Sequence, residues 1–224
     1  MITSRPKLLA LSFAPYVALS LLHLGVKLAG LVELDRATKG LLLPALGLGV
    51  IAVLLLGRLR MTALVTVGLL VGITLSWLGD ITLTDFTTGL TFFLLAHLAY
   101  IAVFHLAFRR RPSWWSVGVV PWYAALLLAL WPYLGDSRVA VALYGAALGY
   151  MAVAATRGNA FTTFGGALFV ASDSLLAFRM FTPLFQTPPE DALIMALYLA
   201  AQLCIAVGVL RTAVPRPAGA RART

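Results

Sequence analysis

The sequence predicts an all-α, polytopic membrane protein in which eight transmembrane helices form one bundle. Of its 224 residues, 61% are hydrophobic and only 11% are charged, and the mean hydropathy is +0.96. A soluble domain carries about 25% charged residues, so this chain has too few polar groups to cover a water-exposed surface. The apolar residues form continuous runs instead of alternating with polar ones, which excludes a transmembrane β-barrel.

Each predicted helix is an apolar run long enough to cross about 30 Å of hydrocarbon. The first run is too long for the apolar region of a signal peptide and is expected to be retained. The second and third are continuously apolar, the fourth contains His97, the seventh contains Asp173, and the eighth contains the single cysteine, Cys204, interpreted as a packing residue. The runs cover residues 8–28, 40–57, 61–79, 86–108, 114–133, 138–156, 160–182 and 191–212.

Two of these runs carry small residues at the spacing that allows helices to approach closely. Gly68 and Gly72 lie in the third run, and Gly145 and Gly149 lie in the sixth. Because each pair is four residues apart, both glycines fall on the same side of a helix. We therefore expect a compact bundle whose polar residues face inward.

The distribution of positive charge predicts that both termini are cytoplasmic. The net charge is +9, but Lys and Arg are spread over alternate loops, which argues against a nucleic-acid partner. With eight spans most of them fall on one side, which the positive-inside rule assigns to the cytoplasm. They are Arg5, Lys7, Arg58, Arg60, Arg109, Arg110, Arg111, Arg157, Arg211, Arg216, Arg221 and Arg223.

The domain organisation expected from this pattern is simple. Residues 1–212 form a single transmembrane domain, and residues 213–224 form a basic, disordered cytoplasmic tail near anionic lipid head groups. The expected location is the cell membrane, as a multi-pass protein of the bacterial inner membrane. Membrane lipid is then the expected surrounding partner.

Three ionisable residues in or beside apolar runs are the candidates for chemistry. Asp173 lies near the middle of the seventh run, where a carboxyl costs about 2.5–3.5 kcal/mol. Asp80 closes the third run, and His97 has Tyr100 one turn further along the same face. With a rise of about 1.5 Å per residue, His97 lies about 16 Å and Asp173 about 12 Å from the non-cytoplasmic ends of their helices. We expect Asp173, His97 and Tyr100 to share a layer, with Asp80 nearer the rim.

Each candidate also has a structural explanation. Asp80 can be a solvated helix cap, and Asp85 is interpreted as the cap of the fourth helix. His97 can be a hydrogen-bonded core residue, and Asp173 can pair with Arg179 to hold helices together. No HxxxH or HExxH spacing is present, so neither a metal nor another cofactor is expected. A GxSxG motif is absent too, which disfavours a serine hydrolase.

Five segments carry a more specific pattern. FTTGLTFFLLAHLAYIAVF (86–104) and GALFVASDSLLAF (166–178) are the most distinctive, and TKGLLLPALG (38–47), SWLGDITL (76–83) and YGAALGYMAVAA (144–155) accompany them. With these segments the chain resembles the lysoplasmalogenases, the YhhN-like integral membrane proteins. One departure is that Gly40 follows Lys39, where the family usually has proline.

The resemblance implies an eight-helix enzyme that acts on a lysophospholipid. Its reaction is hydrolysis of the vinyl ether bond of lysoplasmalogens to a fatty aldehyde and glycerophospho-ethanolamine or glycerophospho-choline. The motif aspartates of the family correspond to Asp80 and Asp173, and the motif His and Tyr correspond to His97 and Tyr100.

The chemistry of a vinyl ether agrees with two carboxyls in unlike settings. Cleavage requires an acid to protonate carbon and a negative charge to stabilise the resulting oxocarbenium ion and orient water. A carboxyl among apolar groups holds its proton, whereas a wetter one stays ionised. We therefore assign Asp173 as the acid and Asp80 as the stabiliser or base, although the reverse order stays open. His97 and Tyr100 would orient water or a carboxyl.

The remaining site residues are predicted from their position beside these groups. A lipid phosphate needs cations at the non-cytoplasmic rim, where Lys27, Lys39 and Arg179 are the candidates. Each of these can equally be an interfacial anchor. Ser76 and Ser172, beside the motif aspartates, are further candidates for contact with the substrate.

Two other functions fit part of the pattern. An intramembrane aspartyl protease also uses two aspartates, but Trp77-Leu78-Gly79 precedes Asp80 where that class has Gly-x-Gly. A proton-coupled transporter or lipid carrier could use Asp173 and His97 as a proton relay. The transporter is the main alternative to the hydrolase.

Overall fold

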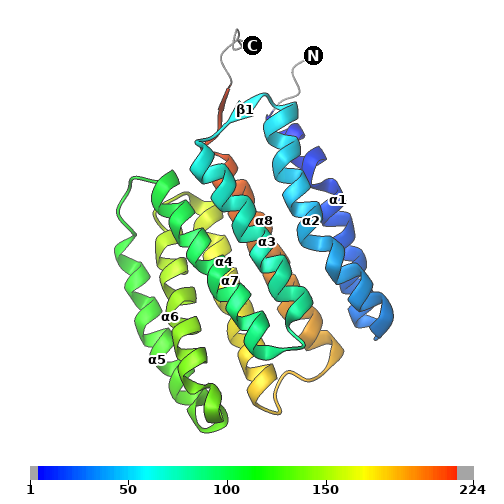
Figure 1. Ribbon diagram of the computed structural model, residues 1–224, viewed down its shortest axis with the longest axis vertical. Coiled ribbons are helices and arrows are strands. Elements are labelled where there is room, and N and C mark those ends of the chain that lie inside the picture. Colours follow the sequence, from blue (N-terminus) through cyan, green and yellow to red (C-terminus); the bar gives the residue numbers. More distant parts are fainter. Residues whose placement is uncertain (1–4, 216–224) are drawn as a thin grey trace.

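A computed structural model gives the structure of the protein over residues 5–215, and within this range eight helices are long and apolar enough to cross a membrane. The predicted all-α, eight-helix architecture is therefore confirmed. The elements, labelled in Figure 1, are α1 (Arg5–Leu28), α2 (Val32–Leu56), the strand β1 (Leu59–Arg60), α3 (Ala63–Thr82), α4 (Phe86–Ala107), the 3₁₀ helix η1 (Trp114–Gly118), α5 (Val119–Leu130), the 3₁₀ turns η2 (Trp131–Tyr133) and η3 (Gly135–Ser137), α6 (Arg138–Ala155), α7 (Ala160–Phe181), α8 (Pro188–Leu210) and the strand β2 (Val214–Pro215).

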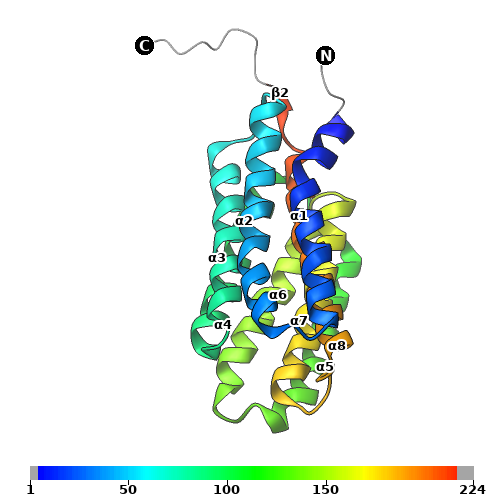
Figure 2. The ribbon, with the colours of Figure 1, turned by 90° about the vertical axis from the view of Figure 1, so that its right-hand side faces the viewer.

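Seven of the eight described helices form a closed ring, and α5 lies outside it. Around the ring, α1 packs against α2, α2 against α3, α3 against α4, α4 against α6, α6 against α7, α7 against α8, and α8 against α1. The ring is flattened into two layers, with α2, α3 and α4 on one side and α1, α8 and α7 on the other (Figure 2). Helix α5 packs chiefly on α6. The inward faces of seven helices can therefore meet at one place.

Both ends of the described chain lie at the same end of the bundle (Figure 1). At the same end, strand β1, which lies between α2 and α3, pairs antiparallel with strand β2, which follows α8. Leu59 lies opposite Pro215, and Arg60 lies opposite Val214. An even number of spans requires this arrangement. The cytoplasmic orientation of this end stays a prediction. Of the predicted tail 213–224, Val214 and Pro215 belong to β2, and residues 216–224 lie outside the described range.

Two of the helix extensions beyond the apolar runs concern candidate residues. Helix α2 begins at Val32 rather than near residue 40, and α3 continues to Thr82 rather than ending at residue 79. The first turn of α2 contains Glu33 and Asp35, and carboxylates there interact favourably with the helix dipole. Hydropathy alone does not count such residues as part of a span. As a result, Lys39 and Asp80 both lie on helices and not in loops.

Side chains cap the N-terminal ends of α4, α7 and α8. The Asp85 carboxylate accepts hydrogen bonds from two backbone N–H groups of the first turn of α4, at 3.1 and 3.2 Å. Its predicted role as a cap is confirmed. Capping boxes start α7 (Asn159 and Thr162) and α8 (Thr187 and Glu190). These bonds satisfy backbone donors where lipid offers no partner.

Glycines bring α3 and α4 into close contact, as the small-residue spacing predicted. A methyl group added at Gly72 would lie 2.5 Å from a ring carbon of Tyr100, and one at Gly68 would lie 2.8 Å from the side chain of Val103. Both distances are shorter than packed carbon atoms allow. The two helix backbones therefore approach through positions that have no side chain.

Replacing Gly72 with alanine is expected to destabilise the bundle by about 1–3 kcal/mol, because the new methyl group overlaps the Tyr100 ring. The measurement is thermal unfolding of the purified protein in detergent. Gly40→Ala is the matched control, since that helical position has open space around it and alanine favours a helix. Equal melting temperatures for the two variants would contradict this account of the α3–α4 contact.

Candidate active site

A cavity of about 290 Å³ lies between the two layers, at the end of the bundle opposite the described termini. Each of the seven ring helices contributes a side chain to its wall, whereas α5 contributes none. Its lining residues are Lys27, Lys39, Asp80, Leu83, Phe93, Tyr144, Ser172, Asp173, Leu176, Arg179, Met180, Asp191, Ile194, Met195 and Tyr198. The two predicted aspartates thus face one cavity from different helices.

A second hollow, between α5 and α6, is larger, at about 460 Å³. Its walls are almost entirely apolar, with residues such as Val117, Val120 and Val153, and no acidic or basic side chain lines it. Size alone does not make a reaction site. The smaller cavity contains the carboxyls and is the candidate active site.

Asp80 lies in the last turns of α3 and is buried, with 8% of its surface exposed. The Tyr198 hydroxyl of α8 donates a hydrogen bond to its Oδ2 at 2.8 Å. The Lys39 ammonium of α2 lies 3.5 Å from its Oδ1. Asp80 therefore has both a hydroxyl donor and a cation, which favour its ionised form.

Asp173, in the middle of α7, is equally buried at 9% exposure but has different partners. The Tyr144 hydroxyl of α6 donates a hydrogen bond to its Oδ2. The only basic group within ion-pair distance, among the described residues, is His97, whose Nε2 lies 4.0 Å from the same oxygen. Each carboxyl therefore accepts a hydrogen bond from a tyrosine of its own, but the nearby basic group differs: a lysine for Asp80 and a histidine for Asp173.

His97 is fixed by its other ring nitrogen. Nδ1 lies 2.6 Å from the carbonyl oxygen of Phe93, and because a carbonyl only accepts, Nδ1 carries the hydrogen. In a neutral ring Nε2 then has the lone pair that points toward Asp173. The ring also packs edge-on against Tyr144 and Phe169, with centroids 5.2 and 4.8 Å apart. His97 thus stands behind Asp173 and is fully buried.

The structure does not bring Tyr100 or Ser76 to the cavity. The Tyr100 hydroxyl donates to Gln202 Oε1 at 2.6 Å, on the side of α8, and Ser76 is fully buried outside the cavity wall. Residues three apart on a helix point about 60° apart, so His97 and Tyr100 reach different neighbours. Ser172 does line the cavity, but its hydroxyl donates to the Ile194 carbonyl at 2.9 Å and ties α7 to α8.

Tyr144 and Tyr198 are site residues that the sequence reasoning did not single out. Each donates to one of the two aspartates, from a different helix. Tyr198 has a polar neighbour, Gln202, four residues further along α8, and such a pair on one face of an apolar run was the available signal. Tyr144 opens the segment 144–155 but has no polar residue one turn away.

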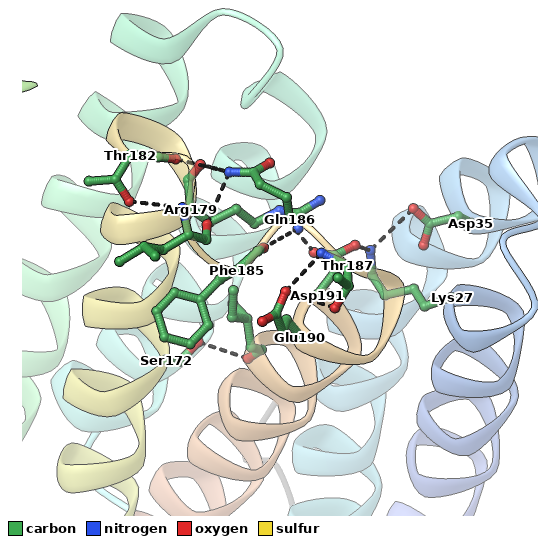
Figure 3. Close-up of polar contacts among 12 residues, drawn as sticks. Lys27, Asp35, Ser172, Arg179, Thr182, Phe185, Gln186, Thr187, Glu190 and Asp191 are labelled. Carbon is green, nitrogen blue, oxygen red and sulfur yellow. Dashed lines mark hydrogen bonds and ion pairs between the residues drawn. The ribbon is translucent and has the colours of Figure 1, made fainter.

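The predicted cations Lys27, Lys39 and Arg179 all line the cavity: Lys39 lies beside Asp80, and the other two lie at the mouth, where the cavity meets a smaller pocket. Figure 3 shows Asp191 between two of them: the Lys27 ammonium lies 2.7 Å from its Oδ2, and Arg179 Nε lies 3.6 Å from its Oδ1. Lys27 also lies 3.2 Å from Asp35. Arg179 therefore pairs with Asp191 and not with Asp173, and the mouth carries charges of both signs.

The fold and this cavity define a multi-pass membrane protein with a buried pair of carboxyls. Within residues 5–215, no three His, Cys, Asp or Glu side chains gather as a metal site. A model of the YhhN family matches residues 34–209, and the chain belongs to that family. The match includes every residue of the cavity wall except Lys27. No curated protein and no solved structure matches the chain.

Replacing Tyr198 with phenylalanine is expected to lower stability by about 1–3 kcal/mol, because it removes the hydroxyl donor of a buried carboxylate. The measurement is thermal unfolding in detergent. Tyr133→Phe serves as the control, since that side chain is exposed on η2. If both variants unfold at the wild-type temperature, the Tyr198–Asp80 hydrogen bond contributes nothing to the fold.

Proposed function

We propose that the protein is a lysoplasmalogenase, which hydrolyses the vinyl ether bond of lysoplasmalogens to a fatty aldehyde and glycerophospho-ethanolamine or glycerophospho-choline. The observation that carries this proposal is the pair of buried carboxyls with unlike partners in one cavity. Membership of the YhhN family is consistent with a hydrolase of this kind. The roles below rest on these contacts.

Asp173 is the acid in this proposal. Tyr144 donates to its Oδ2, so Oδ1 is the oxygen that carries a proton. No lysine or arginine lies within ion-pair distance of it among the described residues, which favours the neutral form in an apolar setting. His97 acts through Asp173 as a positioning residue, because it is buried behind the carboxyl.

Asp80 is the stabilising carboxylate and the base. Lys39 and Tyr198 favour its ionised form, in which it offers a negative charge to the oxocarbenium ion. It also accepts a proton from the attacking water. This division matches the general logic of paired carboxyls that act as acid and base.

The proposed steps restore both groups. Asp173 Oδ1 gives its proton to the vinyl carbon distal to the ether oxygen, which leaves an oxocarbenium ion. Water adds to that ion and passes a proton to Asp80, giving a hemiacetal. Asp80 then protonates the glycerol oxygen as the carbon–oxygen bond breaks, while the hemiacetal hydroxyl returns its proton to Asp173. The net reaction consumes one water.

The cavity wall suits a lipid with a single chain. A small apolar hollow of about 40 Å³ adjoins the cavity at Asp173, and Phe86, Leu90, Val141 and Phe181 help to line it. It runs between α4, α6 and α7, where a hydrocarbon tail would lie against apolar side chains. Lys27 and Arg179, at the mouth, would face the phosphate.

Replacing Asp173 with asparagine is expected to reduce aldehyde release from lysoplasmenylethanolamine by about 10²–10⁴-fold, because asparagine has no acidic proton to transfer. Asp80→Asn is expected to lose activity to a similar extent. Asp85→Asn is the matched control, since asparagine caps a helix as well as aspartate does. A folded Asp173→Asn protein with wild-type turnover would remove the central role of this carboxyl.

The protonation step also predicts how the substrate and solvent affect the product. The purified enzyme in detergent should release aldehyde from the vinyl ether lipid but not from its saturated ether analogue, which has no carbon to protonate. In D₂O the aldehyde should carry one deuterium on the carbon next to the carbonyl, as mass spectrometry would detect. A proton-coupled transporter would release no aldehyde, and cleavage of the saturated ether would refute protonation of carbon.

A further inference from the structure

A second, smaller pocket adjoins the mouth of the active-site cavity. It has a volume of about 150 Å³, and we call it the head-group pocket. It shares Lys27, Arg179 and Asp191 with the cavity, so the two spaces meet at these three side chains. Its lining residues are Lys27, Gly30, Leu31, Val32, Asp35, Arg179, Gln186, Pro188 and Asp191.

The charges along this path change in a definite order. Lys39 stands beside Asp80 inside the cavity, and Lys27 and Arg179 stand at the junction. Asp35 lies beyond the junction, with 31% of its side chain exposed. A ligand that extends from the cavity into the pocket thus passes Lys39 beside Asp80, then Lys27 and Arg179 with Asp191 between them, and reaches the carboxylate of Asp35 last.

From this order we propose that the head-group pocket binds the primary ammonium of a phosphoethanolamine head group, so that the protein prefers ethanolamine lipids over choline lipids. The inference rests on the proposed function, since it assumes that the glycerol and phosphate occupy the cavity and its mouth. The phosphate lies against Lys27 and Arg179 in this arrangement. The ammonium lies against Asp35.

The pocket already accommodates a primary ammonium of the protein itself. The Lys27 ammonium contacts both Asp191 and Asp35 (Figure 3), at distances of 2.7 and 3.2 Å. The second Asp35 oxygen faces the ring of His23, with Nε2 3.5 Å away. A phosphate that binds the Lys27 ammonium competes with the Lys27–Asp35 ion pair. The ammonium of the same head group then takes the place of Lys27 beside Asp35.

The chemistry of the pocket wall separates the two head groups. A primary ammonium has three N–H donors for carboxylate oxygens, whereas the trimethylated nitrogen of choline has none. Quaternary ammonium groups are usually held by aromatic rings, and no aromatic side chain lines this pocket. Each N-methyl group added to the amine therefore removes one N–H donor, and the added methyl group finds no aromatic ring in this pocket to pack against.

Charge balance points to a zwitterion. If Asp173 is protonated as proposed, the charged groups that line the two spaces are Lys27, Lys39 and Arg179 against Asp35, Asp80 and Asp191. A zwitterionic head group leaves this balance unchanged. An anionic head group would add an unpaired negative charge in a partly buried site, which is unfavourable.

The wall of the pocket is held in place by the turn between α7 and α8. Arg179 donates a hydrogen bond to the carbonyl of Phe185 at 2.5 Å, and Phe185 has a left-handed backbone with φ of 57°. The amide nitrogen of Gln186 donates to the carbonyls of Arg179 and Thr182. These contacts fix the guanidinium at the junction before a ligand arrives.

The test measures binding without cleavage. The probes are saturated-ether lysophospholipids with ethanolamine, N-methyl-, N,N-dimethyl-ethanolamine and choline head groups, and the readout is their dissociation constant for the full-length protein in detergent. For the wild type we expect affinity to fall along the series, by roughly tenfold or more between its ends, the scale of one hydrogen bond to a charged group. Equal affinities in the wild type would overturn the proposal.

Asp35→Asn is expected to flatten the series, because its amide offers no charge to the ammonium. Glu33→Gln is the matched control: it removes the same charge from the same turn of α2, but Glu33 is 87% exposed and lies outside the pocket. A full preference retained in Asp35→Asn would also overturn the proposal. The saturated-ether probes are not cleaved, so this binding test is independent of catalysis. If the protein released no aldehyde from vinyl ether lipids, the proposed hydrolysis would be refuted, but the measured head-group preference would not change.

Discussion

Two carboxyls within the span of a membrane impose the constraint that most of this structure satisfies. Lipid offers no hydrogen-bond donors, so each carboxyl needs partners from other helices. Asp80 receives them from α2 and α8, and Asp173 from α6 and α4. The partners of the two residues come from four helices: α2 neighbours α3 and α6 neighbours α7 in the ring, whereas α8 and α4 supply the partners that are not ring neighbours. The close packing of α3 on α4 at Gly72 holds together the helices that carry Asp80 and His97.

The difference between the two carboxyls is what supports a chemical role over a purely structural one. Both carboxyls accept a hydrogen bond from a tyrosine. Asp80 also has a lysine beside it, whereas Asp173 has a buried histidine. The unlike settings are suited to one proton donor and one anion, which is the arrangement that acid-catalysed cleavage of a vinyl ether requires. At the cavity mouth, Lys27 and Arg179 lie beside Asp191, so that charges of both signs are available to a zwitterionic lipid head group.

The architecture and several site residues could be predicted from the sequence, because hydropathy reveals spans and an ionisable residue in a span is conspicuous. The eight helices, Asp80, Asp173 and His97 belong to this group. The exact position of Asp80 could not be predicted, because α3 extends beyond its apolar run and includes this residue. Tyr144 and Tyr198 were missed because a tyrosine in an apolar run resembles a packing residue until its partner is known.

Tertiary neighbours also decided which of two similar positions lies beside Asp173. His97 and Tyr100 are on adjacent parts of one helix face, yet α8 supplies Gln202 to Tyr100 and thereby directs its hydroxyl away from the cavity. The pairing of Asp191 with Lys27 and Arg179 brings the end of α1 to the turn between α7 and α8, which is far from it in sequence. No periodicity in a single chain contains that information.

The placement of α8 has a consequence for how the protein is made. This helix closes the ring between α7 and α1, touches α2 and α3 as well, and supplies Tyr198. Of the eight described spans it is the last to leave the ribosome, because synthesis proceeds from the N-terminus. Until it enters the bilayer, the ring is open and Asp80 lacks its hydroxyl donor. The first seven spans alone therefore form an incomplete enclosure, and the two carboxyls acquire their full set of partners only when α8 is added.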